Sequence, residues 1–522
     1  MTTNDSLPSA QRPTLSTESF LLSFALFKLL LHMAVNVFGA YGYFRDEFYY
    51  LACSEHLDWG YVDQPPLSIA LLTVSRFIFG DSLVGLRFLP ALAGAAMVYV
   101  TGLMTRELGG GRFAQALACV AAIASPIFLA MNSIYSMNSF DILLWTLTAY
   151  LLVRLFKTES PRLWIWIGVV LGLGLLNKIS VLWLGLGIAV GLVATPQRQW
   201  LRTKWPWTAA GIAVLVFLPY MLWNAANDFA HLEFIRNATG EKYSSLTRAA
   251  FAVDQIAIQN PGSVYLWLAG LWYFFMFRPA SKFRVLGYVY VTAFLVLLIN
   301  GASKAEYLSP AYGMLFAGGG VFVEQFIQNR SWNWARPVLI GIPAVIGVVL
   351  MPLVLTVLPV DTYIRYTEAL GVAPSTAENK QLNKLPQFYA DMFGWEELTT
   401  AVLVAYESLP IEDHGRCVIY TQNYGEAGAI SFLGQPFGVP PAVSGHNNYY
   451  LWGPGKHLDS TTVVIIVGGN VEDHRRGFEE VEYVAHSQSK YAMPYENNLP
   501  IFVCRRLKKP IEEVWPRTKN YS

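Results

Sequence analysis

Long apolar segments separated by short polar turns fill most of the first 358 residues. Most of these segments are long enough to cross about 30 Å of hydrocarbon as a helix, and we predict about eleven spans. A further apolar run, Leu67–Phe79, is too short to cross and is predicted to be a re-entrant or interfacial helix. The predicted spans are Phe20–Ala40, Gly85–Thr105, Phe113–Met131, Ser136–Phe156, Leu163–Leu176, Ile179–Ala194, Trp205–Trp223, Val264–Phe277, Val285–Ile299, Ser309–Ile327 and Pro337–Leu358.

The pattern changes after Pro359, where charged residues and turn formers return. Short β-rich runs alternate there with helical stretches, which is typical of a small α/β domain. We predict strands at Cys417–Thr421, Val463–Val467, Val481–His486 and Ile501–Cys504, and a helix at Tyr424–Leu433. The predicted fold class is therefore a mostly α, polytopic membrane protein in residues 1–358, followed by an α/β domain in residues 359–522.

Composition supports a membrane protein. Hydrophobic residues make up 54% of the chain and charged residues only 14%, whereas soluble domains carry about 25% charged residues. The net charge of +1 gives no reason to expect a nucleic-acid partner. The four cysteines have neither zinc-site spacing nor the density of a disulfide framework.

The distribution of basic residues orients the spans. With the amino terminus in the cytoplasm, every short inner loop carries at least two Lys or Arg residues, whereas the short outer turns carry only Lys178 and Lys304. This bias predicts a multi-pass protein of the plasma (inner) membrane. It places residues 41–84, residues 224–263 and the α/β domain outside the cytoplasm, which is the periplasm in a bacterium with two membranes.

The first outer loop gathers acids among aromatic residues that suit a membrane interface. Asp46 and Glu47 follow the first span, and Asp63 precedes a proline pair that ends regular structure. A helix starting at Asp46 would place Tyr50 on the same face as Asp46, whereas Glu47 would lie roughly 100° away. The two adjacent acids are therefore expected to have different roles. An ordinary solvated juxtamembrane loop is the alternative interpretation.

Polar residues inside spans form a second signal. Lys28, His32 and Asn36 follow one another at intervals of four in the first span, and Asn138 and Asp141 lie one turn apart in the fourth. Ionisable groups inside a membrane are costly and usually face the bundle interior or an aqueous cavity. Hydrogen bonds that only hold helices together are the alternative.

Two outer lysines complete the pattern. Lys178 and Lys304 are predicted on the same side as Asp46 and Asp63, at the level of lipid phosphates. A carboxylate can take the proton of an attacking hydroxyl, and cations can stabilise a departing phosphate. Snorkelling of each lysine to the headgroups is the alternative.

At this point the chain resembles a known family. Asp46-Glu47 after the first span, and then Asp63-Gln64-Pro65-Pro66-Leu67, resemble bacterial members of the dolichyl-phosphate-mannose–protein mannosyltransferase family, which includes the lipid A aminoarabinose transferases. Lys304, Tyr307 and Pro310 match its Lys-x-x-Tyr-x-x-Pro signature. Segments of the tail resemble a bacterial subgroup: Tyr424-Gly425-Glu426-Ala427-Gly428, Ser444-Gly445-His446-Asn447, Trp452-Gly453-Pro454, Val503-Cys504-Arg505-Arg506 and Trp515-Pro516.

The resemblance implies the GT-C membrane fold and an inverting glycosyltransferase. Such an enzyme moves a sugar from a polyprenyl-phosphate carrier to an extracytoplasmic glycolipid, glycan or protein, and residues 41–84 would be its catalytic outer loop. Asp46 becomes the candidate base, with Glu47 and Asp63 as further catalytic candidates; Asp63 would hold the acceptor or a divalent cation. The other predicted site residues are Lys304, Tyr307, Lys178 and Arg45 for the donor phosphate, and Gln64, Tyr50, Asn138, Asp141 and Tyr312 for the sugar or acceptor.

One residue departs from the family pattern. Many relatives have Lys before the proline pair, where this chain has Gln64, so phosphate neutralisation must rest on Lys304, Lys178 or Arg45. A transporter or lipid flippase is the alternative function, although the matching broken helices of two halves that mark many transporters are not found. A third possible function is that of a membrane scaffold that only presents the tail domain. The sequence identifies neither the sugar nor the acceptor.

Overall fold

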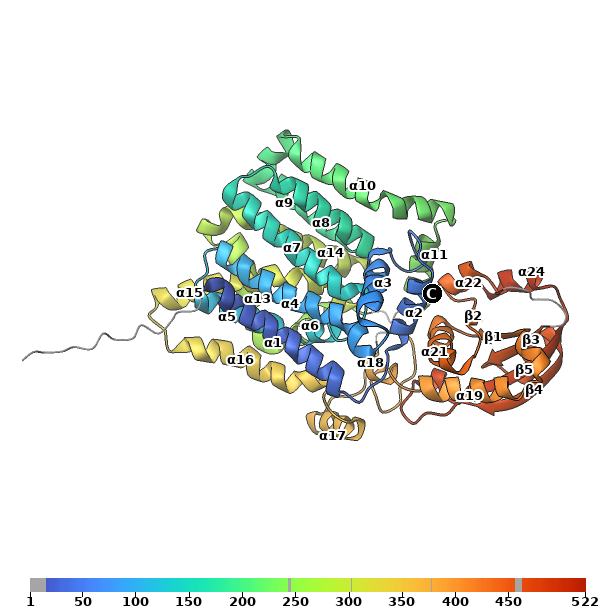
Figure 1. Cartoon of the computed structure of the whole chain (residues 1–522). Coiled ribbons are helices and arrows are strands. Elements are labelled where there is room, and N and C mark those ends of the chain that lie inside the picture. The colour runs from blue at the N-terminus through green and yellow to red at the C-terminus, as the bar shows by residue number, and fades with distance from the viewer. Residues whose placement is uncertain (1–15, 243–245, 302, 377, 456–461) are drawn as a thin grey trace, which may run out of the picture.

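The computed structural model describes residues 16–242, 246–301, 303–376, 378–455 and 462–522. A helical bundle made by the first two thirds of the chain lies beside an α/β domain made by the carboxyl-terminal part (Figure 1). Helix α2 (Arg45–Glu55), from the loop predicted to be the first outer one, lies between these two parts. The bundle and the α/β domain therefore meet at the loop that carries the candidate acids.

Each predicted span contains helix, although several helices end before the predicted bounds. The bundle helices are α1 (Thr17–Phe38), α4 (Leu83–Glu107), α5 (Arg112–Ile123), α6 (Pro126–Met131), α7 (Met137–Thr158), α8 (Leu163–Asn177), α9 (Val181–Ala194), α10 (Trp205–Ala226), α13 (Val264–Phe275), α14 (Arg284–Asn300), α15 (Tyr312–Asn329) and α16 (Ala335–Leu350). The shorter helices around them are α3 (Leu67–Phe79), α11 (Ala230–Asn237), α12 (Arg248–Ile258) and α17 (Val360–Leu370).

Six helices in the described part of the chain are long and apolar enough to cross a membrane, or seven if the bent pair α9 and Pro196–Arg202 is one span. The protein is thus a multi-pass membrane protein, and the number of eleven spans stays a prediction. Leu67–Phe79 forms α3 with the predicted bounds. The predicted span Phe113–Met131 is corrected, because the chain breaks between α5 and α6 at Pro126, which has no N–H to continue a helix.

Helix α1 shows how the bundle separates lipid from interior. Leu26 and Phe27 are exposed on its surface, whereas Lys28 and His32 are fully buried against neighbouring helices. The Lys28 ammonium donates a hydrogen bond to the carbonyl of Phe128 at 3.2 Å. The polar stripe predicted in this helix therefore faces inward, as the cost of exposing charge to hydrocarbon requires.

The α/β domain contains a five-stranded sheet of order β2-β1-β3-β5-β4. β1 (Cys417–Thr421) pairs in parallel with β2 (Ala442–Ser444) and β3 (Val463–Val467), while β5 (Pro500–Leu507) is antiparallel to both β3 and β4 (Phe478–His486). The predicted bounds of β1 and β3 match, whereas β2 was not predicted. The domain's helices are α18 (Gln387–Ala390), α19 (Trp395–Glu407), α20 (Ile411–His414), α21 (Tyr424–Gly434), α22 (Asn448–Trp452), α23 (Val471–Gly477) and α24 (Ile511–Val514).

Helix α21 joins the two parts of the molecule, because it packs against α2 on one side and against the sheet on the other. Two glycines allow this close approach. A Cβ atom at Gly428 would lie 2.8 Å from the backbone of Phe48, and one at Gly425 would lie 2.5 Å from the Arg45 side chain. The Gly-x-x-Gly spacing in α21 thus holds the α/β domain directly on the candidate catalytic loop.

Candidate functional site

A buried ion pair fixes the start of α2. Both Glu47 oxygens accept hydrogen bonds from the Arg87 guanidinium, at 2.8 and 2.7 Å, and the two side chains are 0% and 3% exposed. The same carboxylate accepts the backbone N–H groups of Phe44 and Tyr135, each at 2.8 Å. With its oxygens used in this way, Glu47 anchors α2 to α4 and to the turn before α7. We assign it a positioning role.

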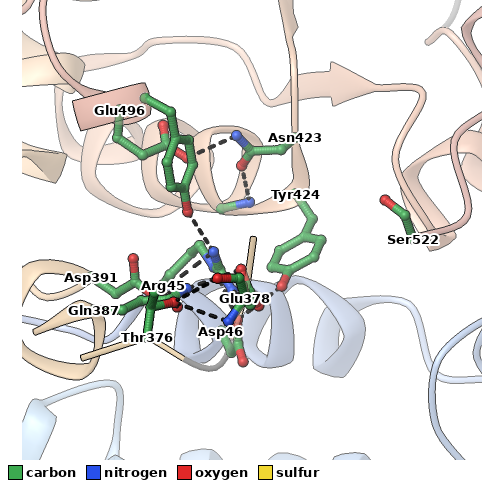
Figure 2. A network of polar contacts seen from close by, with 12 residues as sticks. Arg45, Asp46, Thr376, Glu378, Gln387, Asp391, Asn423, Tyr424, Glu496 and Ser522 are labelled. Atoms are coloured by element: carbon green, nitrogen blue, oxygen red, sulfur yellow. Dashed lines mark hydrogen bonds and ion pairs between the residues drawn. The ribbon is translucent and has the colours of Figure 1, made fainter. Parts of the chain in front are cut away.

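Asp46, one residue earlier, faces outward, and its side chain is 38% exposed. Its Oδ1 accepts hydrogen bonds from the Tyr424 hydroxyl at 2.9 Å and from Arg45 Nε at 3.3 Å. The first donor comes from α21, so the α/β domain orients this carboxylate (Figure 2). Accessibility combined with two oriented donors suits a carboxylate that meets a substrate.

Asp63 is also tied to α2. Its Oδ1 accepts a hydrogen bond from the Tyr49 hydroxyl at 2.8 Å. The loop around it is tied to both parts of the molecule, because Val62 donates its backbone N–H to Asn448 Oδ1 at 2.6 Å and its carbonyl lies 2.9 Å from His231 Nδ1. Asp46 and Asp63 thus sit on a rigid frame.

A second cluster gathers predicted residues from three separate segments. Lys178 Nζ lies 2.6 Å from Asn138 Oδ1 and 3.9 Å from Asp141 Oδ2, and it stands 5.1 Å from the centre of the Tyr307 ring. Ser180 Oγ donates to Asp141 at 2.9 Å. The structure therefore brings together four predicted site residues whose proximity was not evident from their spacing.

Lys304 and its negative neighbour Glu306 belong to the surroundings of Lys178. Burial lowers the pKa of Lys178; Asp141 and Glu306 oppose this shift, and the Lys304 charge adds to it. Two cations near one another favour an anion that both can contact. Tyr312 lies deeper, fully buried, with its hydroxyl 3.0 Å from that of Tyr290; these contacts suit a structural role.

Tyr50 connects the two clusters. Its hydroxyl accepts the backbone N–H of Met137 at 3.1 Å, and Asn177 donates to the carbonyl of the same residue at 2.8 Å. Met137 precedes Asn138 at the start of α7, and Asn177 precedes Lys178 at the end of α8. The acids of α2 and the lysine cluster therefore lie at the same end of the helical bundle.

Arg45 lies in an acidic cluster at the junction, shown in Figure 2. Its guanidinium lies 3.4 Å from Glu378, 3.7 Å from Asp391 and 2.5 Å from the Tyr495 hydroxyl, and only 9% of its side chain is exposed. The sequence predicted that Arg45 binds the donor phosphate. Its positive charge is instead paired with these carboxylates. We therefore assign Arg45 to the junction between the bundle and the α/β domain.

Gln64 is fully buried, and its side-chain nitrogen and oxygen have no hydrogen-bond partner among the described residues. In the same part of the chain, no group of three or more His, Cys, Asp or Glu side chains could hold a metal ion. Asp63 thus belongs to no such group among the described residues. The predicted role of Gln64 in sugar or acceptor binding stays a prediction.

Asp391 makes stability at this junction dependent on pH. Burial raises the pKa of its carboxyl from 3.8 to about 7; Asp46, Glu378 and Glu496 add to this shift and Arg45 opposes it. Because the folded protein keeps a proton that the unfolded chain has lost, this contribution to stability is present below about pH 4 and is lost as the pH rises through about 7. We expect Tm to fall between about pH 5 and pH 8, and to fall less steeply in Asp391→Asn. Differential scanning fluorimetry measures Tm against pH. The same slope in the wild type and in Asp391→Asn would contradict the assignment of this pH dependence to Asp391.

Four residues that complete the site were not identified from the sequence: Arg87, Tyr424, Glu378 and Asp391. Arg87 carried a usable signal, because an arginine inside the predicted span Gly85–Thr105 needs a partner. Tyr424 belongs to a segment noted only for its resemblance to relatives. The other two lie in a stretch with no regular pattern, so only the fold reveals them.

The sequence matches a known family over part of its length. A sequence model described as dolichyl-phosphate-mannose-protein mannosyltransferase matches residues 63–223. The lipid A galacturonosyltransferase RgtD of Rhizobium johnstonii is 26% identical over 276 residues, which cover 50% of this chain and 56% of that protein. The chain therefore spans about half the length of the curated relative that it matches.

Solved structures match over nearly the whole chain. ArnT from Cupriavidus metallidurans in the apo state has a TM-score of 0.59 at 15% identity, covering 93% of this chain and 97% of ArnT. The structure of the same protein bound to undecaprenyl phosphate has a TM-score of 0.58 at 13% identity, with the same coverage. At these identities the likeness concerns the fold.

Together, the bundle, the α/β domain and these matches define a membrane protein of the GT-C fold class. Within that class, residues 63–223 match the sequence model of the dolichyl-phosphate-mannose-protein mannosyltransferase family. The resemblance predicted from the first outer loop is thus confirmed.

Proposed function

We propose that this chain is a glycosyltransferase that moves a sugar from a polyprenyl-phosphate carrier to an extracytoplasmic acceptor, with inversion at the anomeric carbon. The observation that carries the proposal is the outer face itself. An accessible, oriented carboxylate at Asp46 shares this face with a cationic cluster around Lys178 and Lys304. The relative named a lipid A galacturonosyltransferase and the undecaprenyl phosphate bound to ArnT support it.

The residues act as follows. A hydroxyl of the acceptor attacks the anomeric carbon, and Asp46 takes its proton as the new bond forms. The bond from that carbon to the phosphate oxygen breaks on the opposite side, and polyprenyl phosphate leaves. Lys178 and Lys304 stabilise the charge of the departing phosphate, and Tyr307 lies against the Lys178 ammonium. Asn138 and Asp141 hold Lys178 in place.

A divalent cation remains compatible with this scheme. Mg²⁺ is usually held by one or two carboxylates together with substrate phosphates and water, and Asp63 is the carboxylate available for that role. The cation would neutralise phosphate charge. Loss of activity with EDTA and its recovery with Mg²⁺ would support such a role.

The proposal is tested by following the carrier lipid. Purified protein given a polyprenyl-phosphate-linked sugar and an outer-membrane glycolipid extract should release free polyprenyl phosphate. A nucleotide sugar should not replace the lipid donor, because the site opens on the side where nucleotides are not supplied. Equal turnover with a nucleotide sugar and no carrier lipid would refute the proposed donor class.

Lys304→Ala should reduce use of the lipid donor by about tenfold or more. A charge-assisted contact to phosphate is worth about 1.5–3 kcal/mol, which sets this factor. Lys304 is half-buried on the outer side, so its truncation leaves the core intact. Lys282→Ala is the matched control, since Lys282 precedes α14 whereas Lys304 follows it. The same apparent donor affinity in both variants would assign Lys304 to snorkelling.

We further propose that the protein resides in the inner membrane with residues 359–522 in the periplasm. The bias of basic residues toward the opposite loops supports this orientation. Alkaline phosphatase fused after Ser522 should be active, because it folds only outside the cytoplasm. Activity of a cytoplasm-dependent reporter at the same position would reverse the orientation.

A further inference from the structure

A cavity of about 490 Å³ lies between α2 and one edge of the sheet in the α/β domain. Gln422 and Asn423, which follow β1, and Gly468, which follows β3, form part of its wall. The next two strands along the chain, β2 and β3, lie on opposite sides of β1. Ligands of open α/β sheets bind at the carboxyl ends of strands where the strand order reverses in this way.

Asn423 organises the polar wall of the cavity. Its side-chain nitrogen donates to Glu426 Oε1 and to Glu496 Oε1, each at 2.9 Å. Its oxygen accepts the backbone N–H of Gly425 at 2.8 Å and so caps α21. Both carboxylates are therefore held in place before any ligand arrives, which lowers the entropic cost of binding.

Glu496 has a buried carboxylate oxygen that a ligand could contact. It is only 5% exposed, it lines the cavity, and its Oε2 has no hydrogen-bond partner among the residues the structure describes. Leaving a buried carboxylate oxygen unpaired is costly. Burial raises the pKa of Glu496 and of its neighbour Glu426 above their ordinary values, and a hydrogen bond between the two carboxyls adds to the rise at Glu426 and opposes it at Glu496. A hydrogen-bond donor on a ligand would relieve this cost.

The side chains that line the cavity indicate which kind of ligand fits it. The amides of Gln422 and Asn423, the carboxylates of Glu426 and Glu496, and the ring of Tyr495 face one space. Sugar hydroxyls both donate and accept, so they match such a mixture, and a sugar's C–H face packs on an aromatic ring. The volume lies within the range of about 300–1,000 Å³ for small-molecule sites. The described residues offer no three-ligand metal group there.

We propose that this cavity is a saccharide subsite that holds a sugar unit of the acceptor, an inference that rests on the proposed function. Arg45 and Tyr424 line the cavity, and both donate hydrogen bonds to Asp46. A saccharide bound here would lie against the two side chains that orient the candidate base. The α/β domain thus recognises the acceptor and presents it to the bundle.

Binding of four sugars to the full-length protein in detergent tests the subsite: D-glucose, D-galactose, D-mannose and N-acetyl-D-glucosamine. Saturation-transfer NMR should detect at least one of them. Glu496→Gln should weaken that binding by up to about tenfold, because the unpaired oxygen that would accept from a sugar hydroxyl is replaced by an amide NH2 group. Glu397→Gln, an exposed glutamate of the same domain, should bind like wild type. No signal from any sugar, or equal affinity in Glu496→Gln, would overturn the proposal.

Two further measurements keep the result interpretable. Lys380→Ala, at the exposed rim, leaves the buried carboxylates intact and should weaken binding a few-fold even if Glu496→Gln folds poorly. Ca²⁺ that binds wild type and displaces the sugars would make this a cation site and overturn the proposal. Sugar binding without glycosyl transfer would contradict only the proposed function. Transfer with an unchanged acceptor KM in Glu496→Gln would contradict only the subsite.

Discussion

Asp46→Asn should lower the turnover number by about 10²–10⁴-fold, the usual contribution of general-base help. Asparagine keeps the size of the side chain and still accepts hydrogen bonds from Tyr424 and Arg45, but it cannot take the proton of a sugar hydroxyl. Donor binding should stay near wild type, because Asp46 lies in a different cluster from Lys178 and Lys304. Turnover is measured as release of polyprenyl phosphate at matched amounts of folded protein.

Asp63→Asn is the informative comparison for Asp46→Asn. It changes a neighbouring carboxylate of the same loop, which the Tyr49 hydroxyl contacts at 2.8 Å. We expect it to raise the acceptor KM or to alter any dependence on Mg²⁺, with a smaller effect on turnover. An Asp46→Asn variant that turns over like wild type while Asp63→Asn is inactive would transfer the role of base to Asp63.

The second large effect concerns stability. Arg87→Met should lower the free energy of unfolding by about 3–5 kcal/mol, because it leaves the buried Glu47 carboxylate without its charged partner. Glu47→Gln should destabilise for the same reason, with a buried guanidinium left over. The start of α2 would loosen, and the yield of folded protein would fall. Thermal unfolding in detergent, followed by near-UV circular dichroism, measures the change.

The double variant Glu47→Gln/Arg87→Met provides the control for this prediction. It removes both charges together, and a buried ion pair can often be replaced by neutral residues at little cost. The glutamine oxygen can still accept a backbone N–H, as Glu47 does from Phe44 and Tyr135. We therefore expect the double variant to be more stable than either single variant. Additive losses would show that the pair contributes little.

Strong local patterns predicted much of the fold. Leu67–Phe79 and the buried strands Cys417–Thr421 and Val463–Val467 have the predicted bounds, because each is a short apolar run between turn signals. The sequence did not predict β2, because this strand has only three residues. It also did not predict α19. The break at Pro126 was present in the sequence, but the surrounding apolar run concealed it.

The site was harder to predict, because it depends on contacts between distant segments. Asp46 and Tyr424 are 378 positions apart, and Asn138 and Lys178 are 40 apart. The sequence marked Asp46, Lys178 and Tyr307 as candidates through residue type and predicted side of the membrane. It could not show that Arg45 would be paired with carboxylates, since Glu378 and Asp391 gave no local signal.

The central claim is that the donor phosphate sits at the lysine cluster of the outer face. The most direct test is a cryo-electron microscopy structure of the full chain with undecaprenyl phosphate. The account predicts that the phosphate contacts Lys178 or Lys304 and lies beside Tyr307, on the same outer face as Asp46. A phosphate found among the basic residues at the opposite ends of the helices, near Arg154 or Lys282, would contradict it.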